Sequence, residues 1–520
     1  MAYRTFAAID IGSYELAIKI FEISSKNGIK VIDHIMHRIE LGTDSYYTGK
    51  ISSERIDELC RILSEFTNVM ESYKVDDYKA YGTSAIRETK NSVILLDQLR
   101  TRTGIKIEVL SNSEQRFLDY KSVASKVQAF QDIIGKSTAF IDIGGGSIQL
   151  SLFDRESLVT TQNMRPGVLR MREELTSISH RSYQLEDLVE EMLCDRFESF
   201  MKMFVGDKKI QNVILIDDYV SRVLRKSAFK SDKKGYIEAK DFIALVDSLK
   251  ARKSREIAEA LKISEENIQL LHLSALMLKY MLNELDAQLL WVPGVSICDG
   301  MAYEYAEKNK LFSDTDKFAV HDFEQDILAC ARDINRRYSG IERRTNEREE
   351  LSLAIFDHMK KQCGLSKRDR LLLQLAAILS ECGRYISLSN VGMSAYNIIM
   401  ATEIIGLSHL EREIVANIVK YITERFEYNE ILGRVTTLDR EAYLKIAKLT
   451  AILRLAEGID ISHKGKCDKI KLANKGENMV ITVETNADMT LELGFFSRCG
   501  AFFEEVFNIK PVLKQKNSDL

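Results

Sequence analysis

The residue types best suited to chemistry lie between Ala139 and Leu152, where an apolar run enters Asp142 and an alternating apolar run follows four small residues. Glycine backbones let N–H groups approach an anion without a Cβ in the way, and a serine hydroxyl adds a donor. An ordinary Gly-rich hairpin turn explains the same pattern, because such turns also match by chance. The chemical interpretation is a phosphate-binding turn between two strands, formed by Gly144, Gly145, Gly146 and Ser147.

A second copy of this pattern begins the chain. An apolar strand leads into Asp10, and Ile11, Gly12 and Ser13 precede another alternating run. Internal repetition is a stronger signal than either motif alone. We therefore predict two similar half-domains that face each other across a phosphate, with Asp142 placed to hold Mg²⁺ or to orient a water molecule.

The elements around these turns follow from the local pattern. Residues 3–50 are expected to form strands that end near Gly42 and Gly49, and an amphipathic helix follows them. A later helix opens on hydroxyl residues at Ser84, with Arg87 one turn further. A helix N-terminus favours an anion and an arginine adds a charged fork, although a capped helix with a surface arginine is the alternative interpretation.

Composition limits the classes of protein. With 520 residues, 45% hydrophobic and 29% charged, the chain is expected to form several globular domains. The net charge of −4 means that a polyanion must meet a local basic patch, such as the run from Arg222 to Lys234, unless that run is a solvated helix face. No apolar run approaches the roughly 18 residues of a membrane span, no signal peptide is evident at the N-terminus, and the eight cysteines include no Cys-x-x-Cys. We therefore expect a cytoplasmic protein without a membrane partner. One tryptophan and no reader motif give nucleic-acid binding little support.

Four motifs together resemble a known family. Their order and spacing over the first third of the chain are similar to the exopolyphosphatase and guanosine pentaphosphate phosphohydrolase (Ppx/GppA) family, within the actin-like phosphotransferase superfamily. The length suits the long, four-domain form. The motifs are Asp10 to Ser13, Thr83 to Arg87 with Asn91, Glu108 to Ser111 running on to Tyr120, and Asp142 to Ser147.

This resemblance, with the helical periodicity of the later chain, gives an expected architecture. The fold class is α/β, with two actin-like (ribonuclease H-like) domains followed by an all-α HD-like domain and a small α+β C-terminal cap. The expected limits of the four domains are residues 1–125, 126–308, 309–465 and 466–520. The long form in this family commonly dimerises, so a homodimer is an expectation as well.

The resemblance also implies the chemistry. Such proteins bind the end of a polyphosphate chain, or the phosphates of a guanosine penta- or tetraphosphate, between the two actin-like domains. A water molecule, assisted by an acidic residue and Mg²⁺, then attacks the terminal phosphorus. Asp10 and Asp142 fall on the metal- or water-orienting positions. The phosphate-contacting positions correspond to Gly12, Ser13, Ser84, Arg87, Gly144, Gly145, Gly146 and Ser147.

Two departures from the family pattern concern catalysis. Gln115 stands where the family has its general base, and Gln149 stands at its second acidic position. An amide keeps the shape of a carboxylate but cannot usefully accept a proton, and a positioned base is worth about 10²–10⁴-fold in rate. Glu114 is the neighbouring substitute, if the loop places it suitably.

Later segments depart as well. The stretch from Val213 to Tyr219 lacks the glycine turn that an actin-like ATPase or a sugar kinase places under adenosine. In the helical domain, Ser380 and Glu381 replace the His-Asp pair of HD-type domains, so we expect no dinuclear metal site there. This domain is interpreted as a scaffold or an interaction surface.

The expected function is therefore an exopolyphosphatase-like phosphohydrolase that releases terminal orthophosphate from polyphosphate or pppGpp. The retained Asp10, Asp142 and both glycine turns favour this interpretation. The alternative is a catalytically impaired regulatory protein that binds polyphosphate or an alarmone, and Gln115 and Gln149 favour it.

Overall fold

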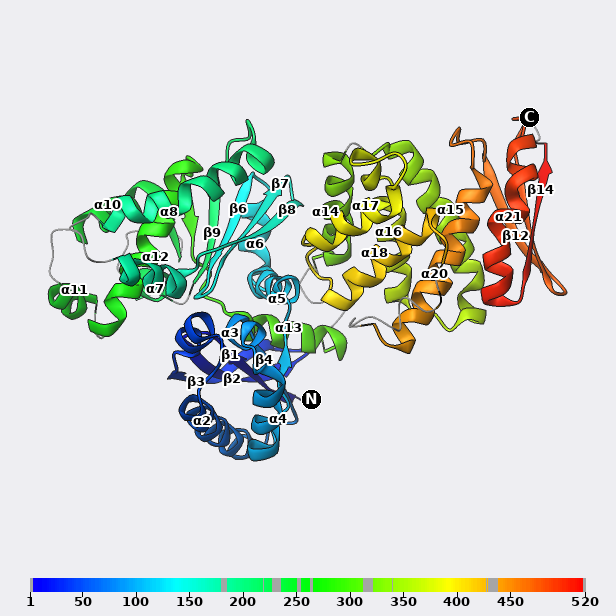
Figure 1. Ribbon diagram of the computed structural model, residues 1–520. Helices are drawn as coiled ribbons and strands as arrows, with labels where there is room; N and C mark the ends of the chain where they lie inside the picture. The colour runs from blue at the N-terminus through cyan, green and yellow to red at the C-terminus, as the bar shows by residue number, and fades with distance from the viewer. Residues whose placement is uncertain are drawn as a thin grey trace. The chain divides into compact units, whose positions relative to one another are not determined.

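The computed structural model contains two compact units, Met1–Asp322 and Phe323–Leu520 (Figure 1). The residues that it describes are 3–178, 185–217, 219–226, 235–249, 254–261, 265–311, 321–338, 340–426, 428 and 438–517. Within these ranges, no helix combines the length and the apolar character that a membrane crossing requires.

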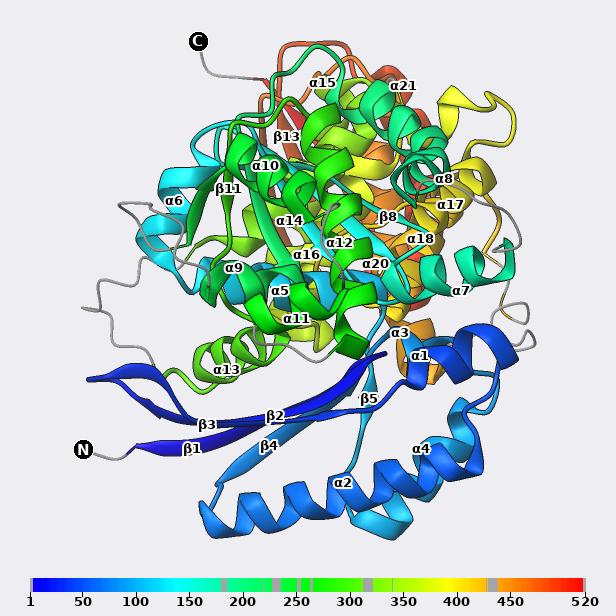
Figure 2. The ribbon, with the colours of Figure 1, turned by 90° about the vertical axis from the view of Figure 1, so that its left-hand side faces the viewer.

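The first sheet of the first unit has the strand order β3-β2-β1-β4-β5. Alternate residues of β1 pack on opposite faces, because side chains along a strand alternate. Ala7 and Ile9 join the core under α2 (Ser53–Ser72) and α4 (Ser92–Thr103), which cover one face of the sheet (Figure 2). The strands are β1 (Arg4–Ile11), β2 (Glu15–Ser24), β3 (Gly28–Arg38), β4 (Asp77–Gly82) and β5 (Glu108–Val109).

The second sheet repeats this arrangement in the order β10-β11-β9-β6-β7-β8. In the first sheet, β1 runs antiparallel to β2 and parallel to β4; in the second, β6 runs antiparallel to β7 and parallel to β9. The predicted repetition of two similar halves is therefore confirmed. The strands are β6 (Thr138–Ile143), β7 (Ile148–Asp154), β8 (Ser157–Met164), β9 (Asn212–Asp217), β10 (Tyr236–Glu238) and β11 (Leu289–Trp291).

A helix near the end of this unit contributes to the core of the first half. Helix α13 (Ile297–Lys308) packs on the first sheet, where Phe6 and Tyr305 stack with ring centroids 4.3 Å apart. The last part of this unit thus completes the core that surrounds the first sheet. The expected domain limits stay predictions. The other helices are α5 (Asn112–Ala124), α6 (Val127–Ile134), α7 (Val168–Ile178), α8 (Leu185–Phe200), η2 (Met201–Val205), α9 (Val220–Lys226), α10 (Ala239–Leu249), α11 (Ser254–Leu261) and α12 (Glu265–Glu284).

One predicted element is wrong. Strand β3 ends at Arg38, and the chain before Gly49 is helical, with α1 (Leu41–Thr43) followed by one π-helical turn, η1 (Asp44–Thr48). Long-range hydrogen bonds hold these two helical segments in place. The Gly42 N–H donates to the Ser13 carbonyl at 2.7 Å, and the Ser45 hydroxyl donates to the Ala85 carbonyl at 2.8 Å. Neither partner is visible in the local pattern.

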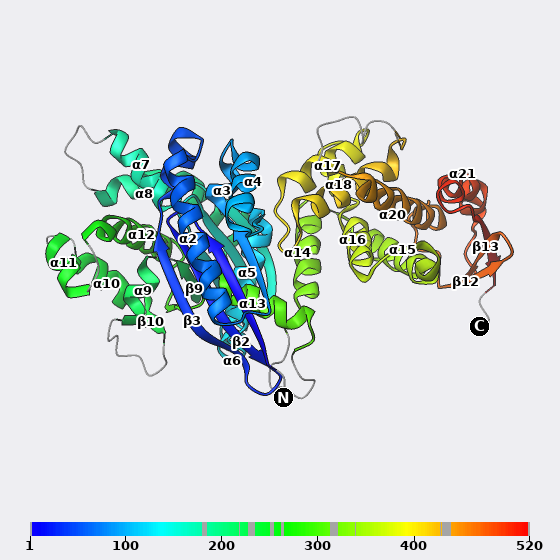
Figure 3. The same cartoon turned by 90° about the horizontal axis from the view of Figure 1, so that it is seen from below.

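The second unit confirms the expected helical domain and α+β cap. In the C-terminal sheet, β13 pairs antiparallel with β12 and parallel with β14, and α21 connects β13 to β14 (Figure 3). The helices of the domain are α14 (Phe323–Arg337), α15 (Glu342–Cys363), α16 (Lys367–Leu379), η3 (Cys382–Tyr385), α17 (Val391–Ala401), α18 (His409–Thr423) and α20 (Arg440–Ile459). The cap contains β12 (Lys469–Lys475), β13 (Asn478–Glu484), α21 (Thr490–Phe507) and β14 (Lys510–Lys516).

Candidate functional site

The two predicted aspartates occupy equivalent places, each as the last residue but one of its strand. Asp142 is buried, and Asp10 has one carboxylate oxygen, Oδ1, that is inaccessible and accepts no hydrogen bond. Burial and the charge of Glu15 raise the pKa of Asp10 to about 7. Burial also raises the pKa of Asp142 to about 7, against the opposing charge of Arg116 and with a contribution from Asp217. The site therefore holds two carboxyl groups that lack sufficient positive charge.

The two glycine turns have the same internal geometry and touch each other. In each turn the first glycine, Gly12 or Gly144, donates its N–H to the carbonyl three residues later, at 2.9 and 3.0 Å. A Cβ added to Gly145 would lie 3.1 Å from the Ser13 Cβ. The fold thus brings together the two motifs that the sequence singled out.

The second turn presents donors rather than acceptors. Its carbonyls at Gly144 and Gly145 accept hydrogen bonds from the first N–H groups of α7, at 3.0 and 2.9 Å. Within the described chain, the N–H groups of Gly145, Gly146 and Ser147 make no hydrogen bond. Successive unpaired N–H groups in a turn form an anion-binding surface.

Three hydroxyl groups meet beside this turn. The Ser13 and Ser84 Oγ atoms lie 2.8 Å apart, and each lies 2.6 Å from the Tyr46 Oη. A Cβ added to Gly146 would collide with the Tyr46 hydroxyl. Ser84 belongs to the short helix α3 (Ser84–Glu88). Sequence reasoning found the two serines but missed Tyr46, whose stretch carries no motif.

The Arg87 guanidinium is partly engaged elsewhere. Its Nη1 donates to the Leu110 carbonyl at 2.6 Å, just after β5. This bond ties the helix that contains Ser84 to the segment that leads into α5. The phosphate-contacting role of Arg87 stays a prediction.

The candidate bases lie at the start of α5. Glu114 is occupied by a capping box, in which its Oε2 accepts from the Ser111 N–H at 2.9 Å and from the Ser111 hydroxyl at 2.7 Å. Gln115 Oε1 is buried and has no hydrogen-bond partner in the described chain. A role for Glu114 as substitute base would have to break its cap, so Gln115 is the freer of the two groups.

Arg116 is a second residue that sequence reasoning missed. Its side chain is only 1% exposed, although arginine is rarely buried without partners. The Nε donates to Gln149 Oε1 at 2.9 Å, and Nη1 donates to the Thr161 hydroxyl. Gln149 lies directly across the β6–β7 ladder from Asp142. The guanidinium therefore supplies positive charge beside the second aspartate and fixes the neighbouring amide.

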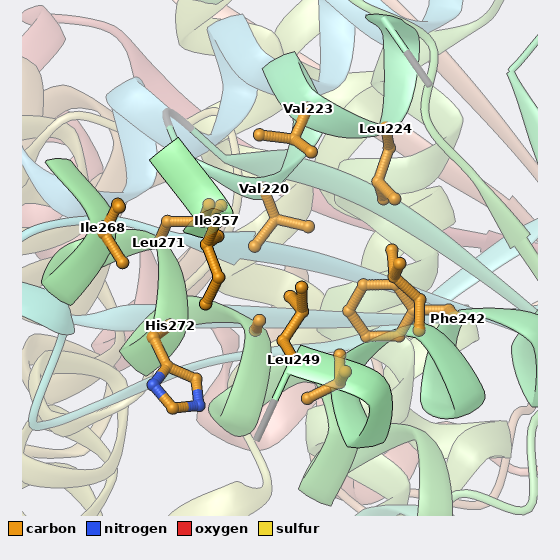
Figure 4. Close-up of a pocket in the computed structure, with 12 residues that line it drawn as sticks. Val220, Val223, Leu224, Phe242, Leu249, Ile257, Ile268, Leu271 and His272 are labelled. Carbon is orange, nitrogen blue, oxygen red and sulfur yellow. The ribbon is translucent and has the colours of Figure 1, made fainter. Parts of the chain in front are cut away.

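The segment after β9, which lacks the glycine turn of actin-like ATPases and sugar kinases, is held by a carboxylate. Asp217 is buried and accepts hydrogen bonds from the N–H groups of Tyr219 and Ser221 at 3.1 and 2.7 Å, and from the Ser274 hydroxyl at 2.6 Å. Helices α9 to α12 line a small apolar pocket whose cavity volume is about 20 Å³ (Figure 4). Such a volume holds about one water molecule, so a nucleoside does not fit among these described side chains. Residues 227–234 of the basic run lie outside the described residues.

The helical domain has an arginine cluster where an HD domain has its His-Asp pair. Arg348 is 5% exposed and donates to the Ser380 hydroxyl and to Glu381, and its Nε donates to Glu457 at 2.6 Å. Arg384 pairs with Glu381 at 2.9 Å. Over both units, as far as they are described, no three His, Cys, Asp or Glu side chains are grouped closely enough to hold a metal ion.

Several known proteins are similar to this chain. It is 33% identical over 114 residues to exopolyphosphatase 1 of Mycobacterium leprae, covering 22% of this chain and 32% of that protein. It is 19% identical to the guanosine-5′-triphosphate,3′-diphosphate pyrophosphatase of Aliivibrio fischeri, over 94% of this chain and 95% of that protein. The crystal structure of an exopolyphosphatase from Cytophaga hutchinsonii matches 60% of this chain and 100% of its own, with 18% identity and a TM-score of 0.51, so the likeness concerns the fold.

The extent of these matches differs. The chain spans only 26% and 32% of the lengths of the first two curated relatives that it matches. The profile of domain III of the Ppx/GppA phosphatases matches residues 329–494. The profile of the Ppx/GppA phosphatase family itself matches residues 19–309, which is more than half of the chain, and the chain therefore belongs to that family.

Proposed function

We propose that this protein is a Mg²⁺-dependent phosphohydrolase that releases terminal orthophosphate from inorganic polyphosphate or from a guanosine 5′-triphosphate 3′-diphosphate. The observation that carries the proposal is the contact between the two glycine turns, which brings Ser13 and Ser84 close to the unpaired N–H groups of the second turn. Asp10 and Asp142 lie near the ends of the two strands that lead into these turns. Relatives named for each of these two substrates support the substrate class.

The residues present fit a magnesium ion. Asp10 Oδ1 is inaccessible and has no hydrogen-bond partner among the described residues, and burial raises the pKa of both aspartates to about 7 although Lys19 and Arg116 oppose the shift, so the nearby positive charge does not offset burial. Mg²⁺ prefers one or two carboxylates together with water and substrate phosphate oxygens, so a site with only two protein ligands suffices. When bound, the ion supplies neutralisation of the charge on the phosphates.

In this proposal the chain's own residues bind and position the terminal phosphate. The N–H groups of Gly145, Gly146 and Ser147 and the hydroxyls of Ser13 and Ser84 bind the terminal phosphate. A water molecule then forms the new P–O bond as the bond to the rest of the chain breaks, giving orthophosphate and a polyphosphate shortened by one unit. Positioning and charge neutralisation supply most of the rate enhancement in phosphoryl transfer, because little covalent chemistry is needed from the protein.

The direct test is the release of orthophosphate by the purified protein. We expect release from long-chain polyphosphate or from pppGpp in Mg²⁺, at least a tenfold loss of rate in excess EDTA, and recovery when Mg²⁺ is added back. The two substrates are measured in parallel, which separates polyphosphate from alarmone specificity. No release from either substrate in Mg²⁺ would contradict the proposal.

The amide at position 115 gives a second prediction. We expect Gln115→Glu to raise kcat for phosphate release by at least tenfold, because a carboxylate there can accept the proton of the attacking water. Gln128→Glu, on the exposed side of α6, makes the same change of charge away from the site and should leave the rate unchanged. An equal or lower rate in Gln115→Glu would show that residue 115 does not lie where a general base could act.

The regulatory alternative depends on the two amides, and the comparisons add nothing in its favour. Binding without turnover by the unmodified protein, together with activity in Gln115→Glu, would revive it. The homodimer stays a prediction.

A further inference from the structure

Tyr46 lies at the centre of the proposed phosphate site. Its hydroxyl is 2.6 Å from both serine hydroxyls, at Ser13 and Ser84, and it is the first atom that a Cβ added to Gly146 would meet. All three of these residues are proposed phosphate contacts. The phenol oxygen therefore lies at a point where a bound phosphate would place one of its own oxygens.

The ring of Tyr46 is also held by a cation. The guanidinium carbon of Arg170 lies 4.0 Å from the ring centroid, and Arg170 forms an ion pair with Glu88. Burial raises the pKa of the Tyr46 phenol, so the hydroxyl is neutral and can both donate and accept. While the ring is in place, it covers one face of the Arg170 guanidinium.

The backbone under Tyr46 is fixed independently of its side chain. Gly42 N–H and the Ser45 hydroxyl bind carbonyls of the first half, and Asp44 Oδ2 accepts from the Ser52 N–H at 2.9 Å. Turns of π-helix occur mostly as single insertions and are frequent at functional sites. The position of η1 therefore does not depend on the hydrogen bonds of the Tyr46 hydroxyl.

We propose that the Tyr46 hydroxyl occupies the place of a phosphate oxygen and must leave when the terminal phosphate binds, so that Tyr46 sets the affinity of the site. This inference rests on the proposed function of the same site. The exchange is chemically balanced, because the phosphate oxygens replace the phenol as partner of the Ser13 and Ser84 hydroxyls. Departure of the ring also frees the face of Arg170 for the anion.

Removal of the hydroxyl tests this exchange. In Tyr46→Phe the ring has lost both hydrogen bonds that hold it in the site, so a bound phosphate displaces it more easily. We expect the Kd for inorganic phosphate, measured by isothermal titration calorimetry, and the KM for polyphosphate to fall about tenfold. Tyr47→Phe is the matched control, because Tyr47 is the next residue of the same turn and is 79% exposed. It should change neither quantity.

A second measurement uses the unmodified protein and so does not depend on the folding of a variant. We expect tetranitromethane to nitrate Tyr47 but not Tyr46 in the free protein, as located by peptide mass spectrometry. Saturating inorganic phosphate should make Tyr46 reactive, with Tyr47 as the internal reference.

The outcomes separate this inference from the proposed function. If the protein hydrolyses polyphosphate but Tyr46→Phe binds phosphate with equal or lower affinity, or Tyr46 stays protected with phosphate bound, the displacement is wrong and the proposed function stands. A weaker affinity in Tyr46→Phe would mean that the phenol donates to the bound phosphate. If neither the unmodified protein nor Tyr46→Phe binds phosphate or releases it from polyphosphate or pppGpp, the proposed function fails and the inference fails with it.

Discussion

Replacing Asp142 by asparagine is expected to lower the rate of orthophosphate release from polyphosphate about 100-fold or more. The substitution keeps the volume of the side chain but removes a buried carboxylate beside both the glycine turn and Arg116. A positioned acid or base contributes about 10²–10⁴-fold, and charge stabilisation by a bound cation contributes several kcal/mol, so either role predicts a loss of this size.

The measurement is the initial rate at saturating polyphosphate and Mg²⁺. Asp132→Asn, on the exposed surface of α6, removes a carboxylate of the same type from the same half and should leave the rate unchanged. A rate for Asp142→Asn within a factor of a few of the unmodified rate would exclude Asp142 from the reacting centre.

The same substitution should stabilise the metal-free protein at high pH. The pKa of Asp142 is about 7 in the folded protein against an ordinary 3.8, so between these values the folded carboxyl holds a proton that the unfolded chain has lost. The free energy of unfolding therefore falls as the pH rises from about 4 to about 7. Above pH 7 the carboxyl is ionised in both states, so the stabilisation by the bound proton is lost and the stability no longer changes with this group. Asparagine has no such titration.

Urea denaturation in EDTA at pH 5 and pH 8 measures this effect. We expect the free energy of unfolding of Asp142→Asn, relative to the unmodified protein, to rise from pH 5 to pH 8. Asp132→Asn should show no such change. If the stability of Asp142→Asn relative to the unmodified protein falls with pH, the ionised Asp142 carboxylate is already stabilised by its surroundings. That result would contradict a site with too little positive charge.

The two glycine turns were predictable because their signals are local. Each turn is coded by adjacent residues around Asp10 or Asp142, and the flanking strands follow from alternation of apolar side chains. The repeated motif then predicted the repeated topology, in which β1 and β6 have equivalent neighbours. Local coding plus internal repetition was enough to place both aspartates.

Tyr46 and Arg116 could not be placed in the same way. Tyr46 meets Ser84 and Gly146, which are distant in sequence, and no local pattern reports such meetings. Arg116 did carry a signal, because Arg116 and Tyr120 lie one helical turn apart on the buried face of α5. That spacing does not show which partner the buried guanidinium has, because Gln149 and Thr161 are distant in sequence.

The packing of α13 shows the same limit for a whole element. Ile297, Met301 and Tyr305 recur every four residues, which predicts a helix with one apolar face. The pattern does not say which sheet receives that face, and the expected second domain, residues 126–308, includes this helix. Phe6 and Ala8, at the start of the chain, take it instead.

Replacing Arg348 by methionine is expected to destabilise the second unit by about 3–5 kcal/mol, the usual cost of removing one partner from a buried ion pair. The guanidinium binds Glu457, Glu381 and Ser380 from a position that is 5% exposed. Although burial raises the pKa of Glu457, Arg348 holds it below its usual range. Methionine of similar length would leave that carboxylate buried without its main partner.

Urea denaturation followed by circular dichroism measures this change in the full chain. Lys367→Met is the matched control, because Lys367 pairs with Glu324 on the surface, where both side chains are exposed, and such pairs contribute at most about 1 kcal/mol. Arg348→Met combined with Glu457→Gln should be less destabilised than the sum of the two single variants, since the uncompensated charge is then removed as well. Additive effects would show that Arg348 acts through packing alone. In that case Arg348 would not stabilise this domain by neutralising the glutamates around it.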